Sequence, residues 1–468
     1  MKKTKIICTI GPACNNEQVL EEMINAGMNV ARINFSHGTD EQHIKTIELI
    51  KKVRAKTNAS LGIMLDTKGP EYRIKTFKDG KVTLNKGDEF TFTTKDILGD
   101  KNIVSVNYKN LAKEISIGDT ILVSNGLLIF KVKKITHSNV LCDVISGGEL
   151  SNNKSMNFPK KVFKGKYISE QDKHDILLGL KYGIDFIACS FVSCVNDVKD
   201  VRKLLDANGG NNVEIIAKIE NQMGVDNAED ILTIADGLMV ARGDLGVEIE
   251  QEKLPFIQKC LIKKCLYAGK LVVTATEMLE SMILNPRPTR AETSDVANAV
   301  YDGTSAIMLS GETAMGKYPV NAVETMAKIA EETEKNIKYS NRFNEMSVLE
   351  NNNLDAVSRA CCRLSIDTNS KAIVACSKTG RTIKQVARFH APCYILGLVT
   401  DKNMFNKLSL YFGVNPLLVK DYKTLDNLFK NATILAKDKF DLRTGDNIII
   451  TGGTSSMTNT NLLKLEKI

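Results

Sequence analysis

The chain contains 468 residues, about three times the length of a typical domain, so we expect several domains. A hydrophobic share of 43% and a charged share of 25% are typical of globular proteins. They exclude a disordered chain, a collagen and a small disulfide scaffold. The net charge of +8 is mild for this length and the lysines are scattered, which argues against a nucleic-acid partner.

Cysteine spacing and hydropathy indicate the cellular compartment in which the protein is found. The 11 cysteines form no C-x-x-C pair and show no Cys/His spacing of the zinc type. No apolar run approaches the ~18 residues that span a bilayer. The basic start of the chain leads into an apolar stretch too short for a secretory signal. We therefore expect a cytoplasmic protein with reduced thiols and no membrane partner.

Eight nearly continuous apolar runs of strand length occur in the first three quarters of the chain, and helix-period segments follow most of them. Continuous apolar character is typical of strands that are covered on both faces. The pattern predicts an α/β fold, a (β/α)8 TIM barrel, whose reacting groups lie at the carboxyl ends of the strands. The runs cover residues 5–10, 28–33, 61–66, 184–191, 213–220, 237–242, 271–276 and 305–309. The main helical segments cover residues 17–26, 39–55, 170–182, 195–207, 251–268 and 319–336.

The third β/α unit is interrupted, because β-type patterning replaces its helix. We predict an inserted small β-barrel domain over residues 70–164, placed as a lid over the mouth of the catalytic barrel, which takes residues 1–69 and 165–340. Beyond a polar stretch, strand and helix patterns alternate again. They predict a separate C-terminal α/β domain over residues 341–468.

Oxygen-bearing side chains follow the second and third runs. The cation of Arg32 precedes Asn34 and Ser36, and Asp66 precedes Thr67. One carboxylate among neutral oxygens suits a weakly held monovalent ion. The same residue types are also common in ordinary turns, and the pattern alone leaves both interpretations open.

The fifth and sixth runs carry the sharper signal. Lys218 and Glu220 point to the same side of a strand, where burial is costly unless they are paired or bind a ligand. Asp244 follows two residues after the end of the neighbouring run, so it forms with Glu220 a carboxylate pair suited to Mg²⁺. The alternative is a buried charge network without a ligand. Thr276 could bind a substrate carboxylate or relay a proton, although threonine is simply common in strands.

Together these segments closely resemble the pyruvate kinases, in order and over nearly the whole chain. The most specific stretches are residues 4–12, 31–38, 65–71, 217–221, 239–246, 274–282 and 285–298. The resemblance implies transfer of a phosphoryl group from phosphoenolpyruvate to ADP, giving pyruvate and ATP, as the last step of glycolysis. It also implies dependence on Mg²⁺ (or Mn²⁺) and K⁺, a cytoplasmic homotetramer, and a sugar-phosphate or nucleotide effector.

The resemblance assigns roles residue by residue. The catalytic residues would be Lys218, Thr276 and Arg32, and the substrate would be bound by Arg32, Gly243, Asp244 and Thr276. Nucleotide contacts would come from Asn34, His37, Arg73 and Lys154. Mg²⁺ would be held by Glu220 and Asp244, and K⁺ by Asn34, Ser36, Asp66 and Thr67. The effector loop would be Ser377, Lys378, Thr379, Gly380, Arg381 and Thr382.

Two positions bear on how far the resemblance extends. Glu71 stands where K⁺-dependent members carry Glu, whereas Glu277 stands where Gln is more usual and adds a negative charge beside Thr276.

A barrel lyase or aldolase would use similar Mg²⁺-binding carboxylates, but it would not need a nucleotide lid. A catalytically silent binding protein is the third hypothesis, and the presence of Lys218, Glu220, Asp244 and Thr276 argues against it.

Overall fold

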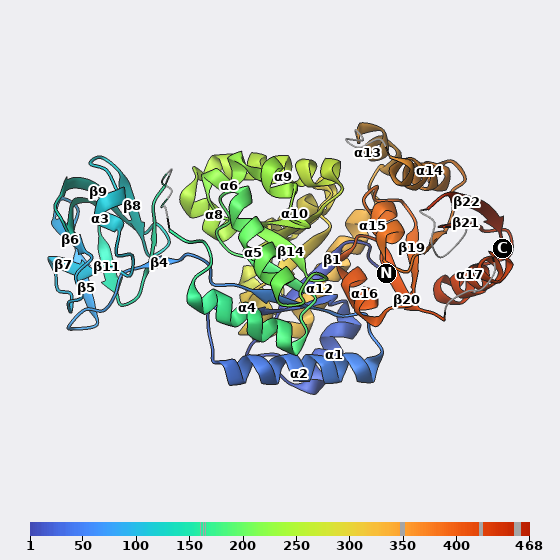
Figure 1. Ribbon diagram of the computed structural model, residues 1–468, viewed down its shortest axis with the longest axis horizontal. Coiled ribbons are helices and arrows are strands. Elements are labelled where there is room, and N and C mark those ends of the chain that lie inside the picture. The colour runs from blue at the N-terminus through green and yellow to red at the C-terminus, as the bar shows by residue number, and fades with distance from the viewer. Residues whose placement is uncertain (160, 162, 164, 347–351, 421–424, 454–459) are drawn as a thin grey trace.

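Eight parallel strands form the closed barrel that the sequence predicts (Figure 1). The computed structural model describes residues 1–159, 161, 163, 165–346, 352–420, 425–453 and 460–468. Around the barrel the strands follow the order β1-β17-β16-β15-β14-β13-β3-β2. Their bounds are β1 Lys5–Thr9, β2 Val30–Asn34, β3 Gly62–Asp66, β13 Phe186–Cys189, β14 Glu214–Ile219, β15 Gly237–Ala241, β16 Leu271–Ala275 and β17 Ala306–Leu309.

Some of the helices around the barrel begin directly after a residue that caps them. Thr39 and Gln42 form a capping box at the start of α2, so the helix predicted from residue 39 begins one residue later. The segment predicted as one helix over residues 251–268 divides into η1 and α9, with Pro255 in the first turn of α9. The bounds are α1 Glu17–Ala26, α2 Asp40–Thr57, α4 Glu170–Tyr182, α5 Val195–Ala207, α6 Gln222–Asp226, α7 Ala228–Leu232, α8 Arg242–Glu248, η1 Gln251–Lys253, α9 Leu254–Ala268, η2 Glu280–Ile283, α10 Arg290–Asp302, α11 Gly311–Ala314, α12 Pro319–Lys335 and α13 Tyr339–Glu345.

The inserted segment is rich in β structure and has its own core. A seven-stranded sheet of order β4-β12-β8-β9-β10-β6-β7 is joined by a two-stranded sheet of β11 and β5. Phe90, Phe92 and Phe130 are fully buried between the strands and contact one another. The bounds are β4 Tyr72–Arg73, β5 Lys81–Leu84, β6 Glu89–Thr93, β7 Ile103–Ser105, α3 Leu111–Glu114, β8 Thr120–Val123, β9 Leu128–Ile135, β10 Asn139–Ser146, β11 Gly148–Ser151 and β12 Ser155–Asn157.

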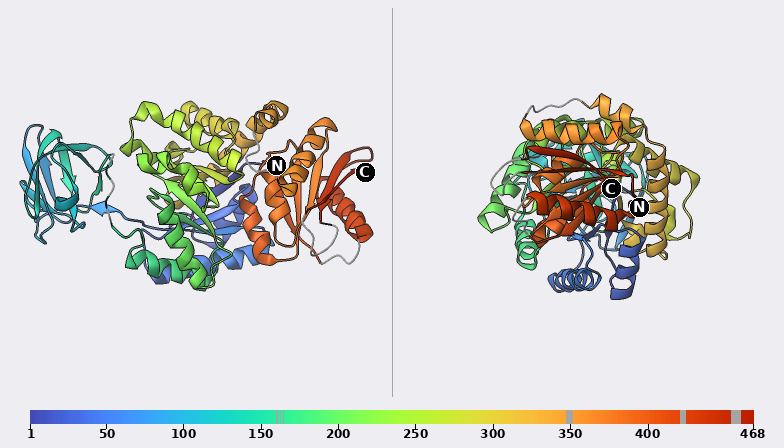
Figure 2. Two further views of the ribbon diagram at one scale, coloured as in Figure 1. Left: turned by 45° about the horizontal axis from the view of Figure 1, so that its top comes forward. Right: turned by 90° about the vertical axis from the view of Figure 1, so that its right-hand side faces the viewer.

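The C-terminal segment forms a five-stranded sheet of order β20-β19-β18-β21-β22. Figure 1 and the left view of Figure 2 place it and the inserted sheet at opposite ends of the barrel. The domain boundaries themselves stay predictions, and the one at residue 164 falls outside the described residues. The bounds are α14 Asn353–Asp367, β18 Ala372–Cys376, α15 Arg381–Ala387, β19 Tyr394–Val399, α16 Lys402–Lys407, η3 Leu408–Leu410, β20 Val414–Leu418, α17 Leu425–Phe440, β21 Asn447–Gly452 and β22 Leu462–Lys467.

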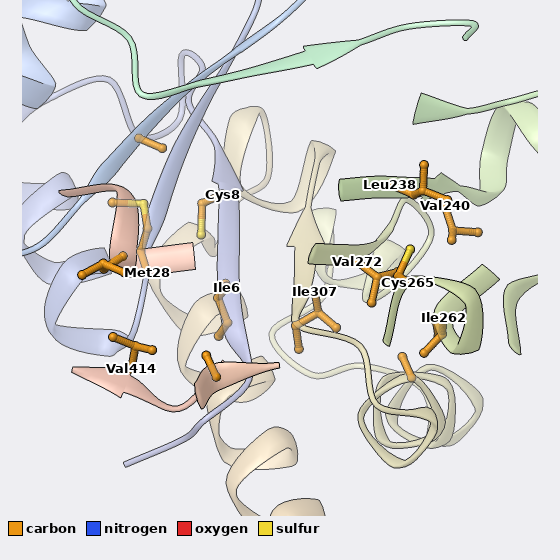
Figure 3. Packing of buried hydrophobic residues seen from close by; sticks show 14 of the residues in the cluster. Ile6, Cys8, Met28, Leu238, Val240, Ile262, Cys265, Val272, Ile307 and Val414 are labelled. Atoms are coloured by element: carbon orange, nitrogen blue, oxygen red, sulfur yellow. The ribbon is translucent and has the colours of Figure 1, made fainter. Parts of the chain in front are cut away.

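One hydrophobic core continues from the barrel into the C-terminal domain. Figure 3 shows Val240 and Val272 on neighbouring strands beside Ile262 of α9, and Val414 of the C-terminal sheet near Ile6 of β1. This continuous packing fixes the C-terminal domain against the amino ends of the barrel strands and leaves the carboxyl ends for the site. Among the described residues, no helix combines the length and the apolar character needed to cross a membrane.

Candidate active site

A cleft lies where the carboxyl ends of the barrel strands face the inserted sheet. Its volume is about 590 Å³, and Arg73 and Lys154 line it from the insertion while Asp244 lines it from the barrel. A parallel barrel brings the ends of all its strands to one rim, so residues far apart in the sequence meet there. Asn34 and His37 are not among the lining residues.

Lys218 lies at the centre of a buried network of charges. Its ammonium is 3.0 Å from Asp66 Oδ1 and 3.0 Å from Glu220 Oε1, and it donates to Ser190 Oγ at 2.6 Å. Burial by itself would lower the pKa of Lys218, but Asp66 and Glu220 raise it above its usual value. The side chain is therefore a permanent positive charge in a site with little solvent.

Glu220 and Asp244 are the predicted carboxylate pair, and the charge of Asp244 acts on Glu220. Burial raises the pKa of Glu220 to about 7; Lys218 opposes this rise and the negative charge of Asp244 adds to it. Glu220 Oε2 also accepts a hydrogen bond from the Phe191 backbone N–H at 2.6 Å, which fixes the carboxylate, whereas Asp244 is exposed. A divalent cation would relieve the repulsion between the two groups. Carboxylates are also the ligands that Mg²⁺ prefers, so this donor set fits Mg²⁺.

A strained turn holds Thr276 beside the backbone of Gly243. Thr276 and Glu277 both have positive φ values, 67° and 53°, which are uncommon for residues with a side chain. Arg242 stabilises the turn: its guanidinium donates to the backbone oxygens of both residues and pairs with Asp295 at 2.6 Å. Thr276 Oγ1 accepts from the Gly243 N–H at 2.7 Å. The turn thus places a hydroxyl and a backbone amide side by side at the rim.

Arg32 pairs with Asp66 at the ends of β2 and β3. Arg32 Nε donates to Asp66 Oδ2 at 2.6 Å, and its Nη1 donates to Thr9 Oγ1 at 2.7 Å. Burial by itself would raise the pKa of Asp66, but Arg32 and Lys218 hold it below its usual value. Two cations thus flank one buried carboxylate, an arrangement suited to the recognition of an additional anion.

The four residues expected to bind K⁺ lie at two neighbouring strand ends. Asn34 and Asp66 are register partners in β2 and β3, and Ser36 and Thr67 follow them. Asn34 Oδ1 accepts from the Ser36 N–H at 3.0 Å, and the Thr67 carbonyl oxygen accepts from Ser190 Oγ at 2.7 Å. The fold therefore places Asn34 beside Asp66 at neighbouring strand ends, and part of the predicted oxygen set is already engaged in hydrogen bonds.

The residues expected to contact nucleotide divide into two groups. Arg73 and Lys154 lie in the cleft, where Arg73 pairs with Glu71 at 2.5 Å and donates to the Asn153 carbonyl oxygen. The other two candidates, Asn34 and the exposed His37, lie at and just after the end of β2. The structure therefore groups only half of the predicted nucleotide contacts in one cleft.

The predicted effector loop, residues 377–382, lies in the C-terminal domain between β18 and α15. Gly380 adopts a positive φ of 74° at the start of α15 and provides no side-chain cap. Thr382 is buried and its hydroxyl lies 2.5 Å from that of Thr460. The loop is a separate region from the cleft.

Two residues of the site were not predicted. Ser190 links Lys218 to the loop after β3, and Arg242 holds the turn at Thr276. For Ser190 the available signal was a hydroxyl at the end of an apolar run. For Arg242 only the tertiary structure shows the partners, because the carboxylate that pairs with it lies 53 residues further along the chain.

Family models and individual relatives match this chain over nearly its full length. A model described as the barrel domain of pyruvate kinase matches residues 1–323, and one described as the alpha/beta domain of pyruvate kinase matches residues 355–466. A pyruvate kinase from Clostridium perfringens is 44% identical over 100% of both chains. Another, from Staphylococcus saprophyticus, is 44% identical over 100% of this chain and 81% of its own length.

A solved structure gives the same result for the fold. The crystal structure of a pyruvate kinase from Cryptosporidium parvum matches with a TM-score of 0.95 at 38% sequence identity. The match covers 100% of this chain and 96% of the crystallised chain. Inserted sheet, barrel and C-terminal domain are thus shared with that structure.

Proposed function

This chain belongs to the pyruvate kinase family and is a phosphotransferase, and from that premise we propose that it transfers the phosphoryl group of phosphoenolpyruvate to ADP. The products are pyruvate and ATP, in the last step of glycolysis. The observation that carries the proposal is the Lys218 ammonium, held at 3.0 Å from both Asp66 and Glu220 at the rim of the barrel.

Lys218 and Arg32 would bind the migrating phosphoryl group. Phosphoryl transfer needs positioning and charge stabilisation more than covalent help from the protein. Lys218 is buried, fixed by three partners and permanently charged, so its field acts on donor and acceptor oxygens without reorganisation. Arg32 is held in the same way by Asp66 and Thr9.

Glu220 and Asp244 would hold Mg²⁺ (or Mn²⁺) together with substrate oxygens. When bound, the ion supplies Lewis-acid stabilisation of the phosphoryl and enolate oxygens. The fit rests on the oxygen donors of the two carboxylates, of which Glu220 is fixed by the Phe191 N–H. Burial, and to a smaller extent the charge of Asp244, raises the pKa of Glu220, which a bound cation would counteract.

The turn at Thr276 would receive the other end of the substrate. The Gly243 N–H donates to Thr276 Oγ1, and the Thr276 hydroxyl donates to the Ala275 carbonyl oxygen. A substrate carboxylate bound at the turn would replace these two acceptors. Thr276 would also help to deliver the proton to the enolpyruvate carbon. Glu277 is exposed at the next position, so its charge is well solvated.

ADP would enter the cleft between barrel and insertion, where Arg73 and Lys154 supply positive charge, with Asn34 and His37 as further contacts. Closure of the inserted domain would exclude water, which otherwise competes for the phosphoryl group.

K⁺ would bind at Asn34, Ser36, Asp66 and Thr67. We extend the proposal to a cytoplasmic homotetramer with a sugar-phosphate or nucleotide effector at residues 377–382.

A coupled assay of pyruvate formation with phosphoenolpyruvate, ADP, Mg²⁺ and K⁺ tests the function directly. Asp244→Asn should weaken the Mg²⁺ and substrate dependence together, because one of the two metal-binding carboxylates is lost. Asp230→Asn, an exposed carboxylate on α7, is the control and should behave as wild type. Absence of pyruvate formation by the wild-type protein would refute the proposed function.

A further inference from the structure

Two helices on the outside of the barrel bring together a histidine and two aspartates. Asp40 is the first residue of α2, and His174 and Asp175 lie in α4. One ligand atom from each residue lies within 4.8 Å of the others. His174 Nε2 and Asp40 Oδ2 are 2.7 Å apart, and their side chains are 53% and 48% exposed. The cluster is separate from the cleft and from all residues assigned to catalysis.

The third residue supplies the observation that an ordinary surface ion pair does not explain. Asp175 is only 2% exposed, and its Oδ2 is buried without a hydrogen-bond partner among the described residues. Its Oδ1 accepts from Gln171 Nε2 at 2.8 Å, so the carboxylate is held in position by its own helix. A buried carboxylate oxygen without a partner is costly, and native structures usually satisfy such atoms with a hydrogen bond, a water or an ion.

The residue types in the cluster indicate which metal ion it would bind. An imidazole nitrogen with two carboxylates suits Zn²⁺ and similar divalent transition metals, whereas Mg²⁺ prefers oxygen ligands alone. Bonds of roughly 2.1 Å in a tetrahedral site require ligand atoms roughly 3.4 Å apart. The observed separations need only a small adjustment, and the half-exposed Asp40 and His174 can make it by side-chain rotation. Gln171 would then orient the buried carboxylate, as residues behind metal ligands commonly do.

An ion bound at the cluster would connect two segments at the rim of the barrel. Asp40 directly follows residues 35–39, the loop after β2. In α4, Asp172 accepts a hydrogen bond from the Gly69 N–H at 3.1 Å, in the segment that leads into the inserted domain. An ion at the cluster would therefore fasten the start of α2 to the helix that anchors this segment.

We propose that Asp40, His174 and Asp175 form a binding site for a divalent transition metal of the Zn²⁺ type, which braces α2 against α4 at the rim of the barrel.

The test measures binding of Co²⁺, a spectroscopic substitute for Zn²⁺, to the full chain after removal of metals. Mg²⁺ in excess occupies the oxygen ligands at Glu220 and Asp244. Equilibrium dialysis gives the bound Co²⁺, and the visible absorption of Co²⁺ reports its coordination. The variants are His174→Ala and Asp175→Asn. The control is His137→Ala, which removes an exposed histidine from the inserted domain. Binding to cysteine thiols would be the same in all four proteins.

The wild-type protein and His137→Ala should bind one Co²⁺ more than His174→Ala. Asp175→Asn should bind this ion at least about tenfold more weakly. Zn²⁺ should raise the Tm of the wild type but leave that of His174→Ala unchanged. Equal Co²⁺ binding by wild type and His174→Ala would overturn the proposal. Because His174 is half exposed, its variant should fold and decides the question even if Asp175→Asn does not.

Discussion

Replacing Lys218 by methionine tests the role of the buried ammonium most directly. Methionine keeps much of the volume and removes the charge, while Asp66 retains its pairing with Arg32. The Lys218 side chain is 11% exposed, so its charge is weakly screened. A unit charge about 4 Å from a second charge contributes about 4 kcal/mol at an effective dielectric constant of about 20. Loss of that amount in the transition state lowers kcat about a thousandfold.

The assay separates the two halves of the reaction. Pyruvate formation from phosphoenolpyruvate and ADP reports phosphoryl transfer, and exchange of the pyruvate methyl protons with D₂O, followed by NMR, reports enolisation alone. Enolisation moves no phosphoryl group, so it should fall far less than pyruvate formation. Lys259→Met is the control, because this lysine pairs with Asp302 on the outer helices and its side chain is 51% exposed. A folded Lys218→Met variant with kcat within about tenfold of wild type would refute the electrostatic argument.

Three further predictions concern the turn, the buried carboxylate and the monovalent ion. Arg242→Lys removes the guanidinium group, which donates to the Thr276 carbonyl oxygen and pairs with Asp295. The turn at Thr276 should then be held less precisely, so kcat should fall about 100-fold with little change in the KM for ADP. A changed KM with unchanged kcat would contradict this prediction. Burial raises the pKa of Asp185 to about 6 although Arg54 opposes the rise, so the folded state binds the proton more tightly and stability falls as the pH rises through this range. In Asp185→Asn this pH dependence is absent. The Tm of the variant minus that of the wild type should therefore increase from about pH 4 to about pH 6, because the wild type loses up to about 3 kcal/mol of stability over this range. A Tm difference that does not change with pH would contradict this prediction. Replacing K⁺ by Tris at constant ionic strength should strongly lower pyruvate formation, since Glu71 occupies the position typical of K⁺-dependent members, and full activity in Tris would reject this assignment.

Two strands differ from what the local sequence pattern predicts. The run predicted over residues 184–191 forms a strand only over Phe186–Cys189, because the chain turns at Ser190 and Phe191, which has a positive φ of 56°. The last strand, Leu462–Lys467, was not predicted: it pairs antiparallel with Asn447–Gly452, and its short, charged pattern carries no clear signal on its own. Register and pairing depend on partners elsewhere in the chain.

The local sequence pattern alone predicts the barrel strands and the placement of Lys218 and Glu220. Apolar runs of strand length fixed the barrel strands, and alternation along a strand put Lys218 and Glu220 on one side, because both patterns follow from backbone periodicity alone. Only the tertiary structure decided which charges meet. Asp66 reaches Lys218 across 152 positions, and Asp40 reaches His174 across 134. Contacts at such separations depend on the closure of the barrel and on how its helices pack, and no local pattern in the chain encodes those distances.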